Sequence, residues 1–596
     1  MNILGLKIAG HDTGAALITT NQKIVAIAEE RLNRVKHSPN MFPHLSIDYC
    51  LKTFGLTDKD IDLIVIDQIH LPEMVPMKEI LKKEAGDRFA HAEVEVINHH
   101  DAHAASAFFC CPYDEAAVIV YDGSGEMFKT PLGVPAIETE TIYYGKGNTL
   151  IETEKTLHPR LPTTKLFLNT FGVGRLYAAI TYYLGFGPYE EGKTMGLAPY
   201  GKPGTFEEVP EELWWKKWRG AYYCNAHLRF PKSFVDSDRA PLVDRIRFGI
   251  KARIYQWLIR ITKKLTGFGA FGGGELFKEP LTFSKPMRGR DTKLPDEYYT
   301  DVAFAVQDVL ETVVKGWAHR AKLLTRAPNL CIAGGVGLNS VANKKIFDEC
   351  GFDDVWIQPG CSDTGIPLGC ALYGLHVVKE KPRFWTMNHA YMGREYTEDE
   401  MEEAIEAVRE KITVKKANDI VKDAAKLLAD QKIIGWFQGG SEYGPRALGN
   451  RSILVDARGK DKKDILNNRV KHRENWRPFA ASVLKDRVED YFTVPKEAGG
   501  NPFMLLVADV INPEEIPSVS HVDDTCRIQT VTKEGNGIYY DLIKAFDDIT
   551  GMPLILNTSF NDAGEPIIES PEDALRSFLG TDLDYLIVGP YIIEKK

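Results

Sequence analysis

The sequence predicts an α/β protein with more than one domain. Short apolar runs typical of buried strands alternate with amphipathic helical segments, and several of the strands end in a Gly-flanked polar loop. Ligands of open α/β sheets bind at such carboxyl ends of strands. Because 596 residues are too many for one ordinary hydrophobic core, two or three domains are expected. The pattern loosens around 379–396, which predicts a boundary between 1–385 and 386–596.

The composition excludes several functional classes. Hydrophobic residues make up 44% and charged residues 26%, as in ordinary globular proteins. A formal net charge of −10 gives no basic field for nucleic acid. No apolar run approaches the roughly 20 residues that span a bilayer, and Met1 leads straight into a strand without a secretory signal. The nine cysteines form no CxxC pair. We expect a cytoplasmic protein that binds neither nucleic acid nor membrane.

One structural unit occurs twice in the first part of the chain. Each copy consists of a strand, a loop with an Asp-x-Gly sequence, and a hairpin, so that Asp12 and Asp122 occupy equivalent loops. A Gly two residues after such an Asp lets the backbone approach a phosphate or a metal. Two chance turns are the alternative, but the matching hairpins favour a duplication. The predicted strands are 3–8, 15–19 and 23–29 in the first copy, and 116–121, 141–144 and 149–154 in the second.

Two histidines precede the second copy. His99 and His103 are four residues apart among small helix-compatible residues, which places both imidazoles on one face of a predicted helix. The strand 116–121 that follows ends at Asp122, and this combination of N and O ligands favours a divalent-metal site. The alternative is that His99 caps the helix and His103 is a satisfied core histidine. On the histidine pair alone, that alternative is the better interpretation.

A Gly-rich segment at 187–194, GPYEEGKT, matches the phosphate-binding P-loop pattern letter for letter. A P-loop must open a helix, yet Gly and Pro recur in the eleven residues from Thr194 to Gly204, so no helix is expected after Lys193. We interpret the segment as a substrate or nucleotide loop. The Trp-, Lys- and Arg-rich region 206–295 predicts an amphipathic helix packed on its aromatic face. A basic lid over an anionic substrate is the weaker alternative.

Further Gly-rich loops follow in the order strand, loop, helix. The strand 329–332 leads into GGVGLN and a helix from Asn339, which directs amide dipoles toward a nucleotide. The strand 354–357 ends in a loop that contains Asp363. Beyond the predicted boundary, cations are interleaved with Gly, Pro, Asn and Trp rather than spaced along a solvated face. Because guanidinium groups match phosphate oxygens, this pattern predicts an anion pocket.

The order of these motifs resembles the ATP-dependent O-carbamoyltransferases of nodulation-factor and antibiotic biosynthesis, the tobramycin carbamoyltransferase type. The motifs are GHDTGAAL, EERLNRVKH, HHDAH, YDGSG, EEGKTMGLAPYG, GGVGLN and SDTG, followed by EYGPRALGNRS, RPFA, RIQTV and NTSFN. The resemblance covers nearly the whole chain. It implies an actin-like (ASKHA) domain at 1–385 that is similar to the universal tRNA threonylcarbamoyl-transfer protein and has an insertion at about 206–295. It also implies a YrdC-like α/β domain at 386–596.

The same resemblance implies roles for individual residues. A divalent metal, iron(II), would be bound by His99, His103, Asp122 and Asp363, and His11 and Asp12 would face the acceptor. Gly335 and Asn339 would contact the nucleotide part of the carbamoyl-adenylate intermediate. The match of Lys36 and Lys193 to the nucleotide-binding residues of the family is less direct. ATP with Mg²⁺ and carbamoyl phosphate would be held by Arg446, Lys471, Arg473, Arg477, Arg527, Asn557, Ser559 and Asn561.

The implied activity is an O-carbamoyl transfer in two steps. Carbamoyl phosphate and ATP would give carbamoyl-adenylate, and the carbamoyl group would pass to a hydroxyl of a natural-product or sugar-like acceptor. The alternatives are tRNA threonylcarbamoylation, a P-loop kinase or NTPase, and a non-catalytic nucleotide-binding scaffold. The sequence leaves open the acceptor, the metal used in the cell and the oligomeric state, with a homodimer among the options.

Overall fold

The structure is a computed structural model that describes residues 1–69, 76–129, 135–159, 172–203, 287–494 and 500–596, with three short strands between 217 and 230. The amphipathic helix expected in 206–295 lies outside the described residues. Among the described helices, none is both long enough and apolar enough to cross a membrane.

The first sheet contains the N-terminal strand–loop–hairpin unit. Its strand order is β3-β2-β1-β4-β5, in which β1, β2 and β3 are antiparallel neighbours while β1, β4 and β5 run parallel. Strands β1 and β2 are buried along their whole length, as their apolar sequences predict. The strands are β1 (Ile3–Lys7), β2 (Gly14–Ile18), β3 (Ile24–Ala28), β4 (Leu63–Gln68) and β5 (Glu93–Asn98).

The second sheet repeats this arrangement. Its order is β12-β9-β8-β6-β13-β14, with β6, β8 and β9 antiparallel and β6, β13 and β14 parallel. The sequence 9-8-6-13-14 therefore has the order and directions of 3-2-1-4-5, which confirms the duplicated, actin-like architecture. The strands are β6 (Glu115–Tyr121), β7 (Met127–Lys129), β8 (Pro135–Lys146), β9 (Thr149–Pro159), β12 (Leu228–Phe230), β13 (Asn329–Ala333) and β14 (Asp354–Ile357).

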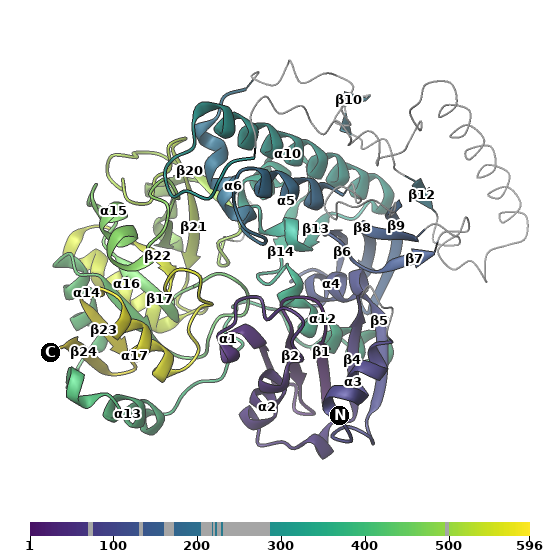
Figure 1. Cartoon of the computed structure of the whole chain (residues 1–596), viewed down its shortest axis with the longest axis horizontal. Coiled ribbons are helices and arrows are strands. Elements are labelled where there is room, and N and C mark those ends of the chain that lie inside the picture. Colours follow the sequence, from purple (N-terminus) through teal and green to yellow (C-terminus); the bar gives the residue numbers. More distant parts are fainter. Residues whose placement is uncertain are drawn as a thin grey trace, which may run out of the picture.

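Two helices lie between these sheets, α4 (His99–Phe108) and α12 (Ile366–Tyr373) (Figure 1). They pack so closely that a Cβ on Gly369 would lie 1.9 Å from the carbonyl oxygen of Ala102, so only glycine fits there. The close packing fixes the loop before α12 beside the first turns of α4. The other helices among the described residues of this part are α1 (Glu29–Asn33), α2 (His44–Thr53), α3 (Met77–Ala85), α5 (Val173–Tyr183), α6 (Glu191–Leu197), α10 (Glu297–Thr325) and α11 (Ser340–Glu349).

The C-terminal part is a second α/β unit, on the left in Figure 1, with its own hydrophobic core. Its mixed ten-stranded sheet has the order β15-β24-β23-β16-β17-β22-β18-β21-β20-β19. The strands are β15 (Ile412–Lys416), β16 (Ile434–Phe437), β17 (Arg451–Val455), β18 (Ala480–Leu484), β19 (Phe492–Thr493), β20 (Val507–Val510), β21 (Thr525–Val531), β22 (Leu554–Ser559), β23 (Tyr585–Val588) and β24 (Tyr591–Lys595). The helices are α13 (Glu398–Glu406), α14 (Ile420–Ala429), α15 (Lys462–Leu466), α16 (Gly537–Thr550) and α17 (Pro571–Gly580).

The expectation that no helix follows Lys193 is wrong. Lys193 lies in the first turn of the short helix α6, and a 3₁₀ turn with Pro199 continues it. Its two glycines, Gly192 and Gly196, weaken but do not prevent a helix of seven residues, and proline is compatible with the first turn of the next one. The segment is nevertheless preceded by helix α5 rather than by a strand, so the strand–loop–helix arrangement of a P-loop is not formed.

Candidate active site

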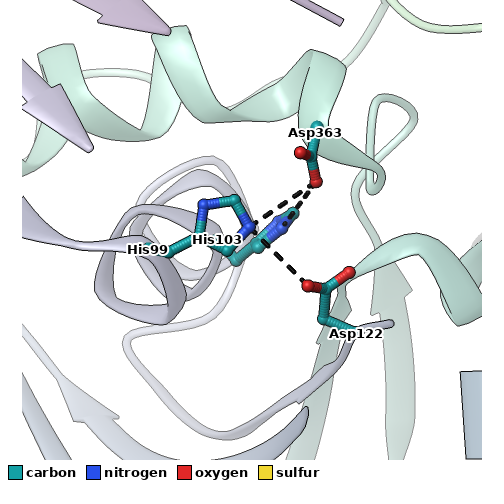
Figure 2. Close-up of side chains that lie close together, drawn as sticks. All are labelled: His99, His103, Asp122 and Asp363. Atoms are coloured by element: carbon teal, nitrogen blue, oxygen red, sulfur yellow. Dashed lines mark ion pairs between the residues drawn. The ribbon is translucent and has the colours of Figure 1, made fainter. Parts of the chain in front are cut away.

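Four side chains from three regions of the first part converge on one point (Figure 2). His99 and His103 lie one turn apart on α4, and Asp122 follows the end of β6. Asp363 begins the turn between β14 and α12. The Nε2 atoms of His99 and His103 lie 3.6 and 3.5 Å from Oδ1 of Asp363, and Nε2 of His99 lies 3.7 Å from Oδ2 of Asp122.

The four residues fit a divalent ion. All are buried, and one ligand atom from each lies within 4.8 Å of the others. Nε2 of His99 and Nε2 of His103 find no hydrogen-bond partner among the described residues, which is costly for buried polar atoms unless a ligand satisfies them. Two imidazoles with two carboxylates are a donor set that suits divalent transition metals.

The histidines do not serve the structural roles that were the alternative. Asn98, not His99, caps α4, because its side chain accepts hydrogen bonds from the amides of His100 and Asp101. His103 is buried, and neither of its ring nitrogens has a hydrogen-bond partner among the described residues, so it is not a satisfied core histidine.

The electrostatics of the cluster favour positive charge at its centre. Burial opposes ionisation of Asp363, but Lys7, His11 and His99 outweigh it and hold the pKa of Asp363 well below its ordinary value. Burial likewise opposes ionisation of Asp122, and contact with His99 still lowers the pKa of that carboxyl. Both carboxylates therefore stay ionised at neutral pH and attract a cation to the space between them.

His11 and Asp12 form the exposed edge of the same site. Nδ1 of His11 lies 3.0 Å from Oδ2 of Asp12, and Nε2 lies 3.6 Å from Oδ2 of Asp363. Asp12 has a left-handed backbone conformation (φ 53°), and its Oδ1 lies 2.8 Å from Nδ1 of His37. Burial opposes ionisation of Asp12, but the two imidazoles lower its pKa to about 2. The side chain of His11 is 30% exposed, so a ligand can reach it from solvent.

The structure adds two charged residues that sequence reasoning missed, Lys7 and Asp67. Nζ of Lys7 lies 3.0 Å from Oδ2 of Asp363 and 3.5 Å from Oδ2 of Asp67, and both residues are buried. Oδ2 of Asp67 lies 2.8 Å from Nδ1 of His99. The signal was present in the sequence, because Lys7 ends the apolar strand β1 and Asp67 follows the four apolar residues of β4.

A second group of predicted site residues gathers in the C-terminal part. Lys471 is buried, and its Nζ donates to the backbone oxygens of Ser559 and Asn561 at 2.9 and 2.8 Å and to Oδ1 of Asn561 at 2.7 Å. Burial lowers the pKa of Lys471 well below its ordinary value, and the neighbouring charges of Arg473 and Arg477 lower it further.

Four arginines form a cluster in which neighbouring members repel one another, and two of them, Arg473 and Arg477, lie close enough to Lys471 to act on its charge. Burial first, and then neighbouring cations, lowers the pKa of Arg473 and Arg527 well below the ordinary value, and burial lowers that of Arg477. The pKa of Arg446 falls to about 10 for the same reasons. Nε of Arg446 and Nε of Arg527 are buried without hydrogen-bond partners in the described part of the chain. A cluster with surplus positive charge and free donors is suited to a polyanion.

Several predicted residues have clear structural partners. Asn339 caps α11 and exchanges hydrogen bonds with Gln307 at 3.0 and 3.1 Å. The side-chain amide of Asn557 donates to Ser482 at 3.0 Å and to Gln529 at 3.2 Å.

The other predicted contacts differ in their setting. Gly335 lies in the 3₁₀ turn after β13, where a Cβ would be 3.9 Å from Oδ1 of Asp122. Lys36 is exposed, and its charge acts on Lys471. Nζ of Lys193 lies between Glu190 (2.7 Å) and Glu474 (2.8 Å).

The two parts of the chain meet between these clusters. Arg446 donates to the backbone oxygen of Leu338, at the end of the loop after β13, at 3.5 Å. His521 donates from Nε2 to the backbone oxygen of Gly196 at 3.0 Å, next to the ion pair of Lys193 with Glu474. The cationic cluster therefore borders the Gly-rich loops of the actin-like part.

In comparisons with known proteins, both halves of the chain match the same family. Residues 2–85 and 75–372 match the description "Carbamoyltransferase N-terminus", and residues 425–595 match "Carbamoyltransferase C-terminus". An uncharacterized Synechocystis protein is 32% identical over 100% of this chain and 97% of its own length. The nodulation protein NolNO of Sinorhizobium fredii is 32% identical over 98% of this chain and 79% of its own length.

Among solved structures, full-length HypF in a phosphate- and nucleotide-bound form is similar at a TM-score of 0.29 and 12% identity, over 62% of this chain and 55% of that one. That likeness is distant and does not bear on the site. The matches to both family halves cover most of the sequence, in the order in which the two sheets and their clusters occur. The chain belongs to the carbamoyltransferase family, and it is an enzyme of carbamoyl-group transfer.

Proposed function

We propose that this carbamoyltransferase uses ATP to activate carbamoyl phosphate as carbamoyl-adenylate and then carbamoylates a hydroxyl of a small natural-product or sugar-like acceptor. The observation that carries the proposal is the pairing of two sites with opposite charge preference in one chain. One is a buried cluster of cations, and the other is a pair of carboxylates and imidazoles that favours a cation.

The first step belongs to the cationic cluster. Arg446, Arg477 and Arg527 repel one another in the free protein, so a triphosphate with its Mg²⁺ and a carbamoyl phosphate would relieve that repulsion. Formation of carbamoyl-adenylate from ATP, carbamoyl phosphate and water releases pyrophosphate and phosphate. The cluster would position the reactants and neutralise their charge, and these two effects supply most of the catalysis in such transfers.

The second step belongs to the actin-like part. His99, His103, Asp122 and Asp363 would hold a divalent ion, proposed to be iron(II), which when bound supplies a Lewis acid that polarises the carbamoyl carbonyl. Asp12 holds Nδ1 of His11, which leaves Nε2 to take the proton of the acceptor hydroxyl. The acceptor oxygen then bonds to the carbamoyl carbon, and AMP leaves.

The half-reactions give the decisive experiment. A positioned general base contributes about 10²–10⁴-fold, so His11→Ala should slow carbamoylation by that factor and leave carbamoyl-phosphate-dependent pyrophosphate release unchanged. Arg527→Met should abolish pyrophosphate release but retain transfer from supplied carbamoyl-adenylate. The exposed His91 provides a control, and His91→Ala should behave as the wild type in both assays.

The outcomes separate the competing interpretations. If His11→Ala and Arg527→Met lose both half-reactions equally, the two sites are not separable and the mechanism is wrong. If the wild type binds nucleotide but releases no pyrophosphate when carbamoyl phosphate is added, the chain is a scaffold. The acceptor itself is sought by incubating the protein with ATP, labelled carbamoyl phosphate and a panel of hydroxylated metabolites, with mass spectrometry of the carbamate products.

A further inference from the structure

Two buried charges lie directly behind the His99–Asp363 pair. Lys7 ends β1 and Asp67 lies near the end of β4, on neighbouring parallel strands whose register pairs Leu6 with Ile66. The side chains of both residues are at most 1% exposed. Charges are rarely so deeply buried unless a specific set of partners holds them there.

Asp67 determines which ring nitrogen of His99 carries the proton. Its Oδ2 lies 2.8 Å from Nδ1 of His99, so an ionised Asp67 accepts the proton of that nitrogen. The Nδ1–H tautomer leaves the lone pair of Nε2 directed at Asp122 and Asp363, at 3.7 and 3.6 Å. A carboxylate behind a histidine is the usual way in which proteins orient a metal-binding imidazole.

The two carboxylate oxygens of Asp363 have different neighbours, and Lys7 is one of those of Oδ2. Oδ1 lies 3.6 and 3.5 Å from the Nε2 atoms of His99 and His103. Oδ2 points the other way, 3.0 Å from Nζ of Lys7 and 3.6 Å from Nε2 of His11. One oxygen therefore faces the point of convergence, and the other is taken by an ammonium group.

We propose that Lys7 and Asp67 are a pair of positioning residues for the metal centre, in which Asp67 fixes the coordinating tautomer of His99 and Lys7 restricts Asp363 to a single ligand oxygen. This inference rests on the divalent ion of the proposed function. It explains why a lysine is buried beside a cation site, where its charge alone would repel the cation. By occupying Oδ2, Lys7 limits the protein ligands and leaves room for the substrate.

Metal binding by the full-length protein tests the pair without any assay of turnover. Competition with a chromogenic chelator measures the affinity for Co²⁺, and the visible spectrum of the Co²⁺ form reports its coordination number. Asp67→Asn should weaken Co²⁺ binding by about 10–100-fold. Lys7→Met should keep one Co²⁺ per chain but weaken its visible absorption, because a second oxygen of Asp363 raises the coordination number.

A matched control is the buried Lys155, whose Nζ lies 2.7 Å from Oε2 of Glu138 in the second sheet. Lys155→Met also removes a buried lysine, and it should leave the Co²⁺ affinity and spectrum as in the wild type. Lys155→Met should also release pyrophosphate at the wild-type rate.

The failures are distinguishable. If the wild type binds no stoichiometric Co²⁺ or Fe²⁺, the metal of the proposed function is wrong and this inference falls with it. If the wild type binds the ion and both variants match Lys155→Met in affinity and spectrum, the positioning role is wrong while the proposed function stands. Should Lys7→Met not fold, Asp67→Asn decides by affinity alone, because asparagine has the same shape as aspartate.

Discussion

Replacing Arg446 by methionine should make the ligand-free protein more stable. Burial and the charge of Arg477 lower the pKa of Arg446 to about 10. Its guanidinium donates one long hydrogen bond, of 3.5 Å, to Leu338, and its Nε has no partner in the described residues. Keeping this charge in place therefore lowers the stability of the fold, and a methionine of similar length retains most of the apolar stem.

The size of the effect follows from the pKa. At roughly 1.4 kcal/mol per pH unit, lowering an arginine pKa from about 12.5 to about 10 costs about 3 kcal/mol. Because the folded-state pKa lies below that of the unfolded chain, the full penalty is present at every pH below about 10 and disappears as the pH rises above it. Loss of the hydrogen bond offsets about 1 kcal/mol, which leaves a net gain of about 2 kcal/mol at pH 7.

Urea unfolding at pH 7 without nucleotide measures this gain, and Arg458→Met is the matched control. Arg458 pairs with Asp456 at 2.6 Å, which raises its pKa, so its removal should destabilise the protein. Added ATP should stabilise the wild type more than Arg446→Met, since the variant has less repulsion to relieve. If Arg446→Met is less stable than the wild type, as Arg458→Met should be, and ATP stabilises the wild type and Arg446→Met equally, the cluster is not a preformed anion site.

Two further predictions concern other parts of the actin-like half. Burial and the charge of Glu138 raise the pKa of Glu126 to about 7, so the folded state keeps a proton that the unfolded chain releases, and stability falls as the pH rises from about 4.5 to 7. Urea unfolding of Glu126→Gln at pH 5 and pH 8 should show this fall reduced by about 3 kcal/mol. An unchanged pH dependence would contradict the assignment. Lys193→Ala should leave carbamoyl-phosphate-independent ATP hydrolysis unchanged in a phosphate-release assay, because Lys193 pairs with Glu190 and Glu474, whereas abolished hydrolysis would favour the P-loop alternative.

The sequence predicted those features that depend on local pattern. Helical spacing placed His99 and His103 on one face, and the apolar run before Asp122 gave the strand that ends beside them. The repeated strand–loop–hairpin units predicted the duplicated sheets. That Asp363 joins this group depends on β14 lying beside β13 and β13 beside β6, a pairing that periodicity cannot reveal. Only the family resemblance placed Asp363 among the expected metal ligands.

The omissions have physical reasons. Lys7 and Asp67 look like exceptions in apolar strands, and only the pairing of β1 with β4 shows that their side chains form an ion pair at 3.5 Å. Propensity excluded a helix after Lys193 because it weighs Gly and Pro as interior residues, whereas α6 ends before Pro199. Asn339 caps α11, as an Asn before a helix ordinarily does, and its contact with a nucleotide stays a prediction.

The loop after β13 contacts both of the clusters that the proposed two-step mechanism uses. Gly334, with φ of 90°, packs so tightly that a Cβ would lie 2.1 Å from the backbone oxygen of Tyr121, the residue before Asp122. The same loop ends at Leu338, whose carbonyl receives Arg446 from the cationic cluster. One short turn thus touches both sites, and its close packing leaves it little freedom to move. In the proposed mechanism, carbamoyl-adenylate made among the arginines would pass this turn to reach the carboxylates, and a transfer inside the protein would protect this mixed anhydride from hydrolysis.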